Sequence, residues 1–145
     1  MALNTFLLLI ISHVLGDVVV NSYRLAVLKR NSALYNQILA IGFHSSVHAL
    51  LAGIFILSFG GYWLKAAMLI LIAHFVIDFL RCRVEISLFG PDRIYVKRSE
   101  LIAWISGKAK GAEKMKISKL WPWLVIHVLD QSAHLGSLYV IALIV

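Results

Sequence analysis

The chain has 145 residues, of which 61% are hydrophobic, with a formal net charge of +7 and a mean hydropathy of +0.86. Soluble domains average roughly 45–50% apolar residues. The excess here is gathered into long runs, which excludes an ordinary soluble domain and indicates a membrane protein.

Four apolar segments predict four membrane-spanning helices, and at this length we expect one domain, residues 1–145. In chain order the segments cover about residues 2–20, 33–59, 63–80 and 121–145. Each is long enough to cross a hydrocarbon layer about 30 Å thick at about 1.5 Å per residue. Helices satisfy their own backbone in lipid, so the predicted fold class is all-α, a four-helix transmembrane bundle.

The beginnings of two segments carry further signals. The first has no basic residue before its apolar run, so we expect a retained span rather than a secretory signal peptide. Ser32 precedes the second segment and is expected to cap it.

The single cysteine, Cys82, excludes a disulfide scaffold and a cysteine-only zinc site.

The loops between the segments differ in charge. The first loop has Arg24, Lys29 and Arg30, while the loop 81–120 holds ten of the fourteen Lys and Arg residues. The positive-inside rule therefore predicts that both loops are cytoplasmic and both termini lie outside, in a multi-pass protein of the cell inner membrane. We expect contact with the bilayer and its anionic inner-leaflet lipids rather than with nucleic acid.

The long loop is expected to contain a short amphipathic helix. In PDRIYVKRSELIAWIS, Asp92 would cap a helix that has Leu101 and Ile105 on one side and Lys97 and Arg98 elsewhere. Such a helix would lie on the inner leaflet. The alternative is a solvated charged loop that only fixes the orientation of the protein.

All six histidines and three of the seven acidic residues lie in the apolar segments. Their spacings are i,i+4 or i,i+3,i+7, so each group lies on one face of its helix. Turning such a face to lipid would cost several kcal/mol, so the four faces are expected to meet in a polar centre. The residues are His13, Asp17, His44, His48, His74, Asp78, His127, Asp130 and His134.

These nine side chains are the candidate ligands of a divalent metal. Neutral imidazole and carboxylate both bind such ions, and the positive ion offsets the carboxylate charge. Nine candidates exceed what one zinc uses, so we expect one or two ions of zinc, manganese or iron, with some of the nine orienting ligands instead. Any carboxylate that is not a ligand, Asp130 or Asp17, would serve as a general base.

Each of these side chains also has a structural interpretation. A single buried histidine is usually a hydrogen-bonded contact between helices. Asp17 would then anchor its helix near the interface, and Asp78 would form an ion pair with Arg81. The joint pattern favours a metal site over separate polar contacts.

The motifs HVLGD, HSSVHALL, HFVIDFLR and LDQSAH resemble the domain-of-unknown-function 3307 family of small prokaryotic and phage membrane proteins. The resemblance covers all four segments and implies a shared pattern of H-x-x-x-G-D, H-x-x-x-H, H-x-x-x-D and D-Q-x-x-H. It assigns no activity. The matching positions are His13, Gly16, Asp17, His44, His48, His74, Asp78, Asp130, Gln131 and His134, and His127 stands outside the pattern.

The first functional hypothesis is a membrane-embedded, metal-dependent hydrolase acting on a lipid or phosphoester at the cytoplasmic side. The chain contains no G-x-S-x-G, H-E-x-x-H or P-loop motif, so serine-hydrolase, zincin and nucleotide-binding interpretations lack their signatures. One alternative is metal-ion or proton transport, for which a homo-oligomer would supply additional helices. Another is a b-type haem electron carrier, although carboxylates at i+4 would oppose the apolar macrocycle.

Overall fold

The computed structural model describes every residue except 1, 21, 61 and 108–116, and the described residues form helices without any strand. The helices are α1 (Ala2–Val20), α2 (Tyr23–Leu28), α3 (Leu34–Ser58), α4 (Trp63–Phe89), α5 (Arg98–Ile105) and α6 (Ile117–Ile144). Four of them, α1, α3, α4 and α6, are long and apolar enough to cross a membrane. The predicted fold class, an all-α bundle with four spanning helices, is confirmed.

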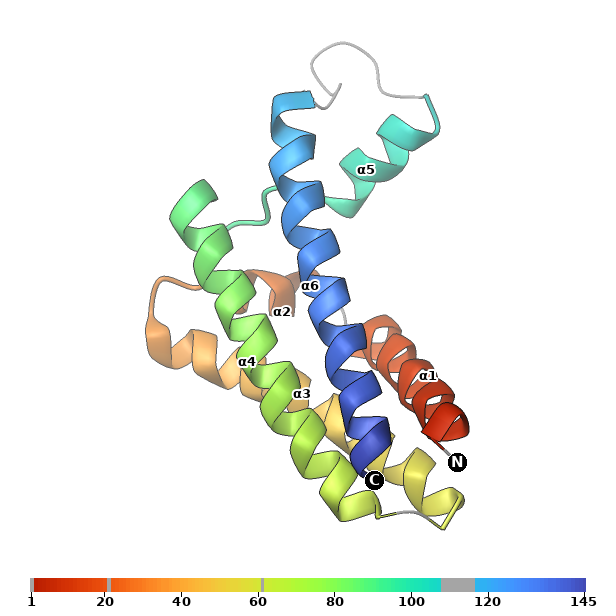
Figure 1. Cartoon of the computed structure of the whole chain (residues 1–145). Coiled ribbons are helices and arrows are strands. Elements are labelled where there is room, and N and C mark those ends of the chain that lie inside the picture. The colour runs from red at the N-terminus through yellow and green to blue at the C-terminus, as the bar shows by residue number, and fades with distance from the viewer. Residues whose placement is uncertain (1, 21, 61, 108–116) are drawn as a thin grey trace.

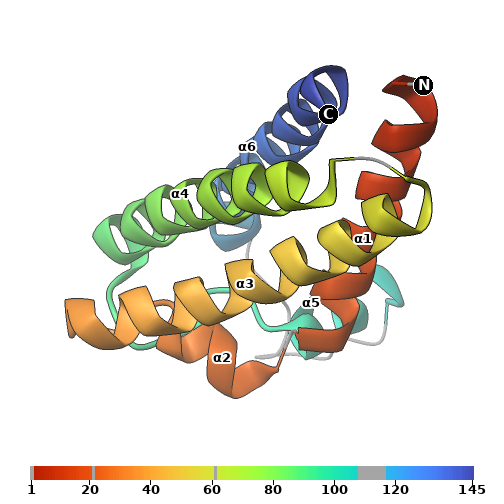
Figure 2. The ribbon, with the colours of Figure 1, turned by 90° about the horizontal axis from the view of Figure 1, so that it is seen from below.

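The four long helices form a closed ring in which each packs against two neighbours. α3 and α4 lie side by side along their length, and α6 closes the ring between α4 and α1 (Figures 1 and 2). The chain alternates direction, so both termini and the α3–α4 connection lie at one end of the bundle (Figure 1). The other end carries α2, the segment 90–97 and α5, and we refer to it as the capped end.

The half of the bundle near the termini has an apolar interior. At this level Gly53 of α3 lets α4 approach closely, since an added Cβ would lie 3.4 Å from that of Ala67. Close van der Waals packing is the main source of helix association in lipid. The buried cluster consists of Leu9, Ala52, Ile56, Ala66, Ile70, Leu138, Ile141 and Ala142.

The outward surface of the four long helices is also apolar. Leu50 of α3, Ile72 of α4 and Leu143 of α6 are 63%, 58% and 60% exposed. A soluble monomer rarely exposes a large continuous apolar surface. The arrangement therefore suits surrounding lipid, as the composition indicated.

The third span is longer than the sequence predicted. α4 continues past Leu80 to Phe89. The charged residues Arg81 and Glu85 face the interior, where their side chains are 16% and 8% exposed and form ion pairs. The predicted loop 81–120 is therefore shorter, with α4 ending at Phe89 and α6 beginning at Ile117. Its residues 108–116 lie outside the described part of the chain.

The short helix in this loop is present as α5, but Asp92 does not cap it. The N-cap is Lys97, whose backbone N–H donates to Glu100 Oε2 at 2.9 Å. The predicted cap at Ser32 is also wrong, because α3 begins after Ala33. Lys119 forms an ion pair with Glu100 at 3.1 Å, which links α5 to α6.

Asp92 instead joins the two segments of the capped end. Its Oδ1 accepts hydrogen bonds from Asn31 Nδ2 at 2.8 Å and from the Ser32 N–H at 3.1 Å. Its own N–H donates to the Arg30 carbonyl at 2.9 Å, and its φ of 59° lies in the left-handed region. Asparagine and aspartate tolerate this conformation better than alanine does.

Replacing Asp92 by alanine is expected to destabilise the protein by about 1–3 kcal/mol, because two hydrogen bonds are lost and a strained φ remains. Thermal unfolding in detergent would measure the change. Asp92→Asn is the matched control, since it keeps an acceptor oxygen and tolerates the backbone conformation. Equal unfolding temperatures for Asp92→Ala and the unmodified protein would show that this link contributes nothing.

Candidate metal centre

Five of the six histidines meet in the interior of the bundle, between the apolar cluster and the capped end. The closest ring pair is His48 and His74, with centroids 3.9 Å apart, and His74 lies 4.3 Å from His134. His13 and His44 complete the set, with neighbouring rings at 4.5–5.3 Å. All five residues are at most 6% exposed. The predicted helix faces therefore do turn toward one another.

The histidines and three aspartates form four groups, each with three ligand atoms within 4.8 Å of one another. Four residues, His44, His48, His74 and Asp78, belong to two groups each, so the groups are connected. Such sharing suits more than one ion held by common ligands. The groups are His13–His48–His74, Asp17–His44–His48, His44–His74–Asp78 and Asp78–Asp130–His134.

Several of the buried imidazoles have ring nitrogens with no hydrogen-bond partner among the described residues. Both nitrogens of His48 are in this state, and so is Nε2 of His13, His74 and His134. An unsatisfied buried polar atom costs about 1–3 kcal/mol. A divalent ion accepts the lone pairs of neutral imidazoles, so the donor set fits a metal site better than a set of structural hydrogen bonds does.

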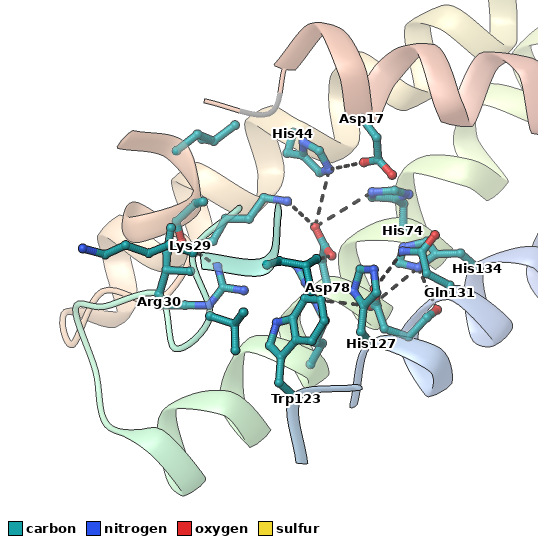
Figure 3. Close-up of a pocket in the computed structure, with 18 of the residues that line it drawn as sticks. Asp17, Lys29, Arg30, His44, His74, Asp78, Trp123, His127, Gln131 and His134 are labelled. Carbon is teal, nitrogen blue, oxygen red and sulfur yellow. Dashed lines mark hydrogen bonds and ion pairs between the residues drawn. The ribbon is translucent and has the colours of Figure 1, made fainter. Parts of the chain in front are cut away.

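His127 is the predicted ligand that stands apart. It belongs to none of the four groups found among the described residues. Its ring stacks on Trp123, with centroids 5.1 Å apart and planes at 10°, and its side chain is exposed. His127 does line the cavity beside the centre (Figure 3).

Gly16 allows α1 to reach the centre. A Cβ at this position would lie 2.6 Å from Cε1 of the His48 ring, closer than real Cβ contacts. The glycine of the H-x-x-x-G-D motif therefore makes room for a histidine on a different helix. Asp17, the next residue, then lies 3.4 Å from His48 and 3.6 Å from His44, measured between carboxylate oxygen and Nε2.

Two cations lie against the carboxylates: Arg81, the expected ion-pair partner of Asp78, and Lys29, which was expected only to indicate topology. Lys29 Nζ is 2.6 Å from Asp78 Oδ2, and Arg81 Nη2 is 3.2 Å from Asp78 Oδ1. The Arg81 Nε atom is also 3.3 Å from Asp130 Oδ1. Burial lowers the pKa of the Lys29 ammonium, and the adjacent Asp78 carboxylate opposes that shift.

A second pair, Arg30 with Glu85, holds α2 against α4. Gln37 of α3 fixes the same segment by donating to the Lys29 carbonyl at 2.9 Å. Arg81 and Glu85 were missed as site residues, although the spacing contained a signal. They continue the stripe of His74 and Asp78 by one and two further turns of α4.

A cavity of about 440 Å³ adjoins the centre on the side of the capped end. Figure 3 shows Asp17, His44, His74 and Asp78 on one part of its wall and Trp123 on another. Its cationic lining residues include Lys29 and Arg30, which follow α2, Arg81 of α4, and Lys97, which immediately precedes α5. A small anionic molecule in this space would contact candidate metal ligands and positive charges together.

The sequence motifs that build this centre identify the family. A family model described as "Protein of unknown function (DUF3307)" matches residues 5–145, nearly the whole chain. The chain belongs to the DUF3307 family. Searches among curated proteins and among solved structures found no significant match.

Two DUF3307 motif positions, Gly16 and Gln131, are neither histidine nor carboxylate, and both help to position the candidate ligands. Gly16 provides the close approach to His48. Gln131 donates from Nε2 to Asp130 Oδ2 at 3.0 Å and so orients that carboxylate. The remaining motif positions are the eight members of the four groups.

Proposed function

We propose that this DUF3307 protein is an integral membrane, metal-dependent hydrolase that acts on a phosphoester at the cytoplasmic side of the membrane. The observation that supports this most strongly is the set of four connected His/Asp groups beside a cavity with cationic walls. Metal ligands alone would suit many roles, whereas cations facing the same cavity favour an anionic substrate.

The donor set favours zinc, manganese or iron, which accept mixed nitrogen and oxygen ligands. Asp78 belongs to two groups, one shared with His44 and His74 and one with Asp130 and His134. If two ions were held, Asp78 could therefore serve both groups. We therefore propose two ions, with one as the lower limit.

A bound divalent ion would activate water and polarise a phosphoryl oxygen. In hydrolysis the water oxygen bonds to phosphorus, the ester P–O bond breaks, and the alcohol leaves with a proton. Of the two predicted general bases, Asp17 is better placed to accept the proton of water, since its side chain is 40% exposed and lines the cavity. Asp130 is only 3% exposed and is already paired with Arg81.

Lys29 and Arg81 would hold the phosphate. Both reach the cavity, and both pair with Asp78. A dianionic phosphate carries two negative charges, whereas the Asp78 carboxylate between these two cations carries one. Its arrival would let each cation keep Asp78 as one partner and gain a phosphate oxygen as another.

The alternatives have less support. An ion pathway would need polar groups across the whole membrane, whereas the half of the bundle near the termini is filled by apolar residues such as Leu9, Ile56 and Ile141. A haem would need a flat space between imidazoles, yet the rings of His48 and His74 stack at 3.9 Å. Hydrolysis is therefore the function that these contacts favour.

We infer the cytoplasmic location of the capped end from the distribution of basic residues along the chain. Lys29 and Arg30 form buried ion pairs, so they add little to the positive-inside signal. The basic residues of the segment 90–119 carry it instead, with Lys and Arg outnumbering Asp and Glu there. In the orientation that we propose, the chain crosses the cell inner membrane several times and both termini lie outside.

Removing metal from the purified protein is expected to reduce phosphate release to background, and adding back zinc, manganese or iron should restore it. Metal would be counted by mass spectrometry before and after chelation, and release would be measured on a panel of phosphomonoesters and phosphodiesters. Phosphate release that survives complete metal removal would contradict the proposal. So would a metal-loaded protein that is inactive on every phosphoester tested.

A further inference from the structure

A second, apolar groove lies between α4 and α6 on the outer surface of the bundle, with a volume of about 230 Å³. Its walls come from matching i,i+3,i+7 stripes on the two helices. The apolar residues are Ile77, Leu80 and Val84 of α4 and Ile126, Leu129 and Ala133 of α6.

The rim of this groove faces outward. Leu80, Val84 and Leu129 are 58%, 47% and 64% exposed. In a helix that crosses a membrane, such side chains contact lipid chains rather than water. The groove runs along α4 from Ile77 to Val84, a length of about 10 Å at about 1.5 Å per residue.

The floor of the groove is polar and is shared with the metal centre. Arg81 and Asp130 line both the groove and the 440 Å³ cavity. Their closest atoms, Arg81 Nε and Asp130 Oδ1, are buried and lie 3.3 Å apart as an ion pair. The pair thus stands between a lipid-facing apolar surface and the other candidate ligands.

We propose that the groove receives a hydrocarbon chain of an anionic, phosphate-bearing lipid, and that the lipid phosphate binds Arg81 at the edge of the cavity. This inference rests on the proposed function and names its substrate class. The apolar walls match the chain, and the guanidinium matches the phosphate. Because Arg81 and Asp130 line both spaces, one lipid molecule could place its chain in the groove and its phosphate in the cavity. A soluble phosphoester would leave the groove unused.

The test measures lipid binding separately from hydrolysis. Long-chain phosphatidic acid and water-soluble glycerol phosphate would be titrated into the metal-loaded protein in detergent, with binding followed by native mass spectrometry. Ala133→Phe and Val84→Trp fill the groove. Val76→Trp is the matched control, because Val76 is on the same helix, is equally exposed at 47% and does not line either cavity.

The affinity for phosphatidic acid is expected to fall about tenfold in both groove variants, since van der Waals contacts with the chain are lost. Their metal content and their affinity for glycerol phosphate should not change, and Val76→Trp should bind like the unmodified protein. Equal lipid affinity in all four proteins would overturn the inference, even if phosphoesters are hydrolysed. Groove-dependent lipid binding without any hydrolysis would support the groove assignment and contradict the proposed hydrolase.

Discussion

Replacing both His44 and His48 by alanine is expected to remove at least one bound ion per protein and to abolish phosphate release. The two histidines supply ligand atoms to three of the four groups, and only the Asp78–Asp130–His134 group would stay intact. Loss of a partner that merely orients a ligand already weakens metal binding about 10–100-fold. Loss of two direct ligands should therefore weaken it by more than about a hundredfold.

Metal per protein after dialysis, measured by mass spectrometry, and phosphate release would report the outcome. His127→Ala is the matched control, because His127 is a histidine of the same cavity that belongs to none of the four groups. The control should keep its ions. If the double variant elutes as a folded protein with an unchanged metal content, the histidines are structural contacts and the centre is not a metal site.

Replacing Gly16 by alanine is expected to damage the centre without altering any ligand. The added Cβ would lie 2.6–2.9 Å from three atoms of the His48 ring, so α1 or His48 must move. His48 is 1% exposed and has little room to do so. Overpacking of this kind costs about 1–3 kcal/mol. Because His48 belongs to two groups, metal affinity should fall at least about tenfold as well.

Unfolding in detergent and metal titration would measure these two effects. Gly136→Ala on α6 is the control, since nothing lies within 4 Å of the added Cβ. Alanine favours a helix over glycine by up to about 1 kcal/mol, so this variant should be as stable as the unmodified protein or more so. Unchanged metal affinity in Gly16→Ala would show that the contact with His48 does not position a ligand.

The spanning helices could be predicted because long apolar runs raise the local hydropathy, and all four helices have at least one end close to the expected residue. The extension of α4 to Phe89 could not be predicted this way, since RCRVEISLF is as polar as a loop. Its charges are satisfied by residues distant in sequence, such as Arg30, which pairs with Glu85. The short helix α2 depends on the same tertiary contacts and has no apolar periodicity of its own.

Much of the candidate site followed from helical spacing. The i,i+4 pairs on α1, α3 and α4 were predicted to face inward, and His13, His44 and His74 do so. The inward position of Lys29 could not be predicted, because a basic residue in a loop usually reports topology and its contact with Asp78 joins positions 49 residues apart. The separation of His127 follows from its stacking on Trp123, which competes with a turn toward the other imidazoles.

The apolar cluster around Ile56 and Ile70 has a physiological consequence. A buried array of imidazoles and carboxylates could in principle conduct protons and collapse the electrochemical gradient on which the cell depends. Here an apolar cluster about one helical turn thick separates that array from the end of the bundle that carries the termini. A metal centre of the kind proposed here would thus hold its ions inside the membrane while the bilayer remains an electrical insulator.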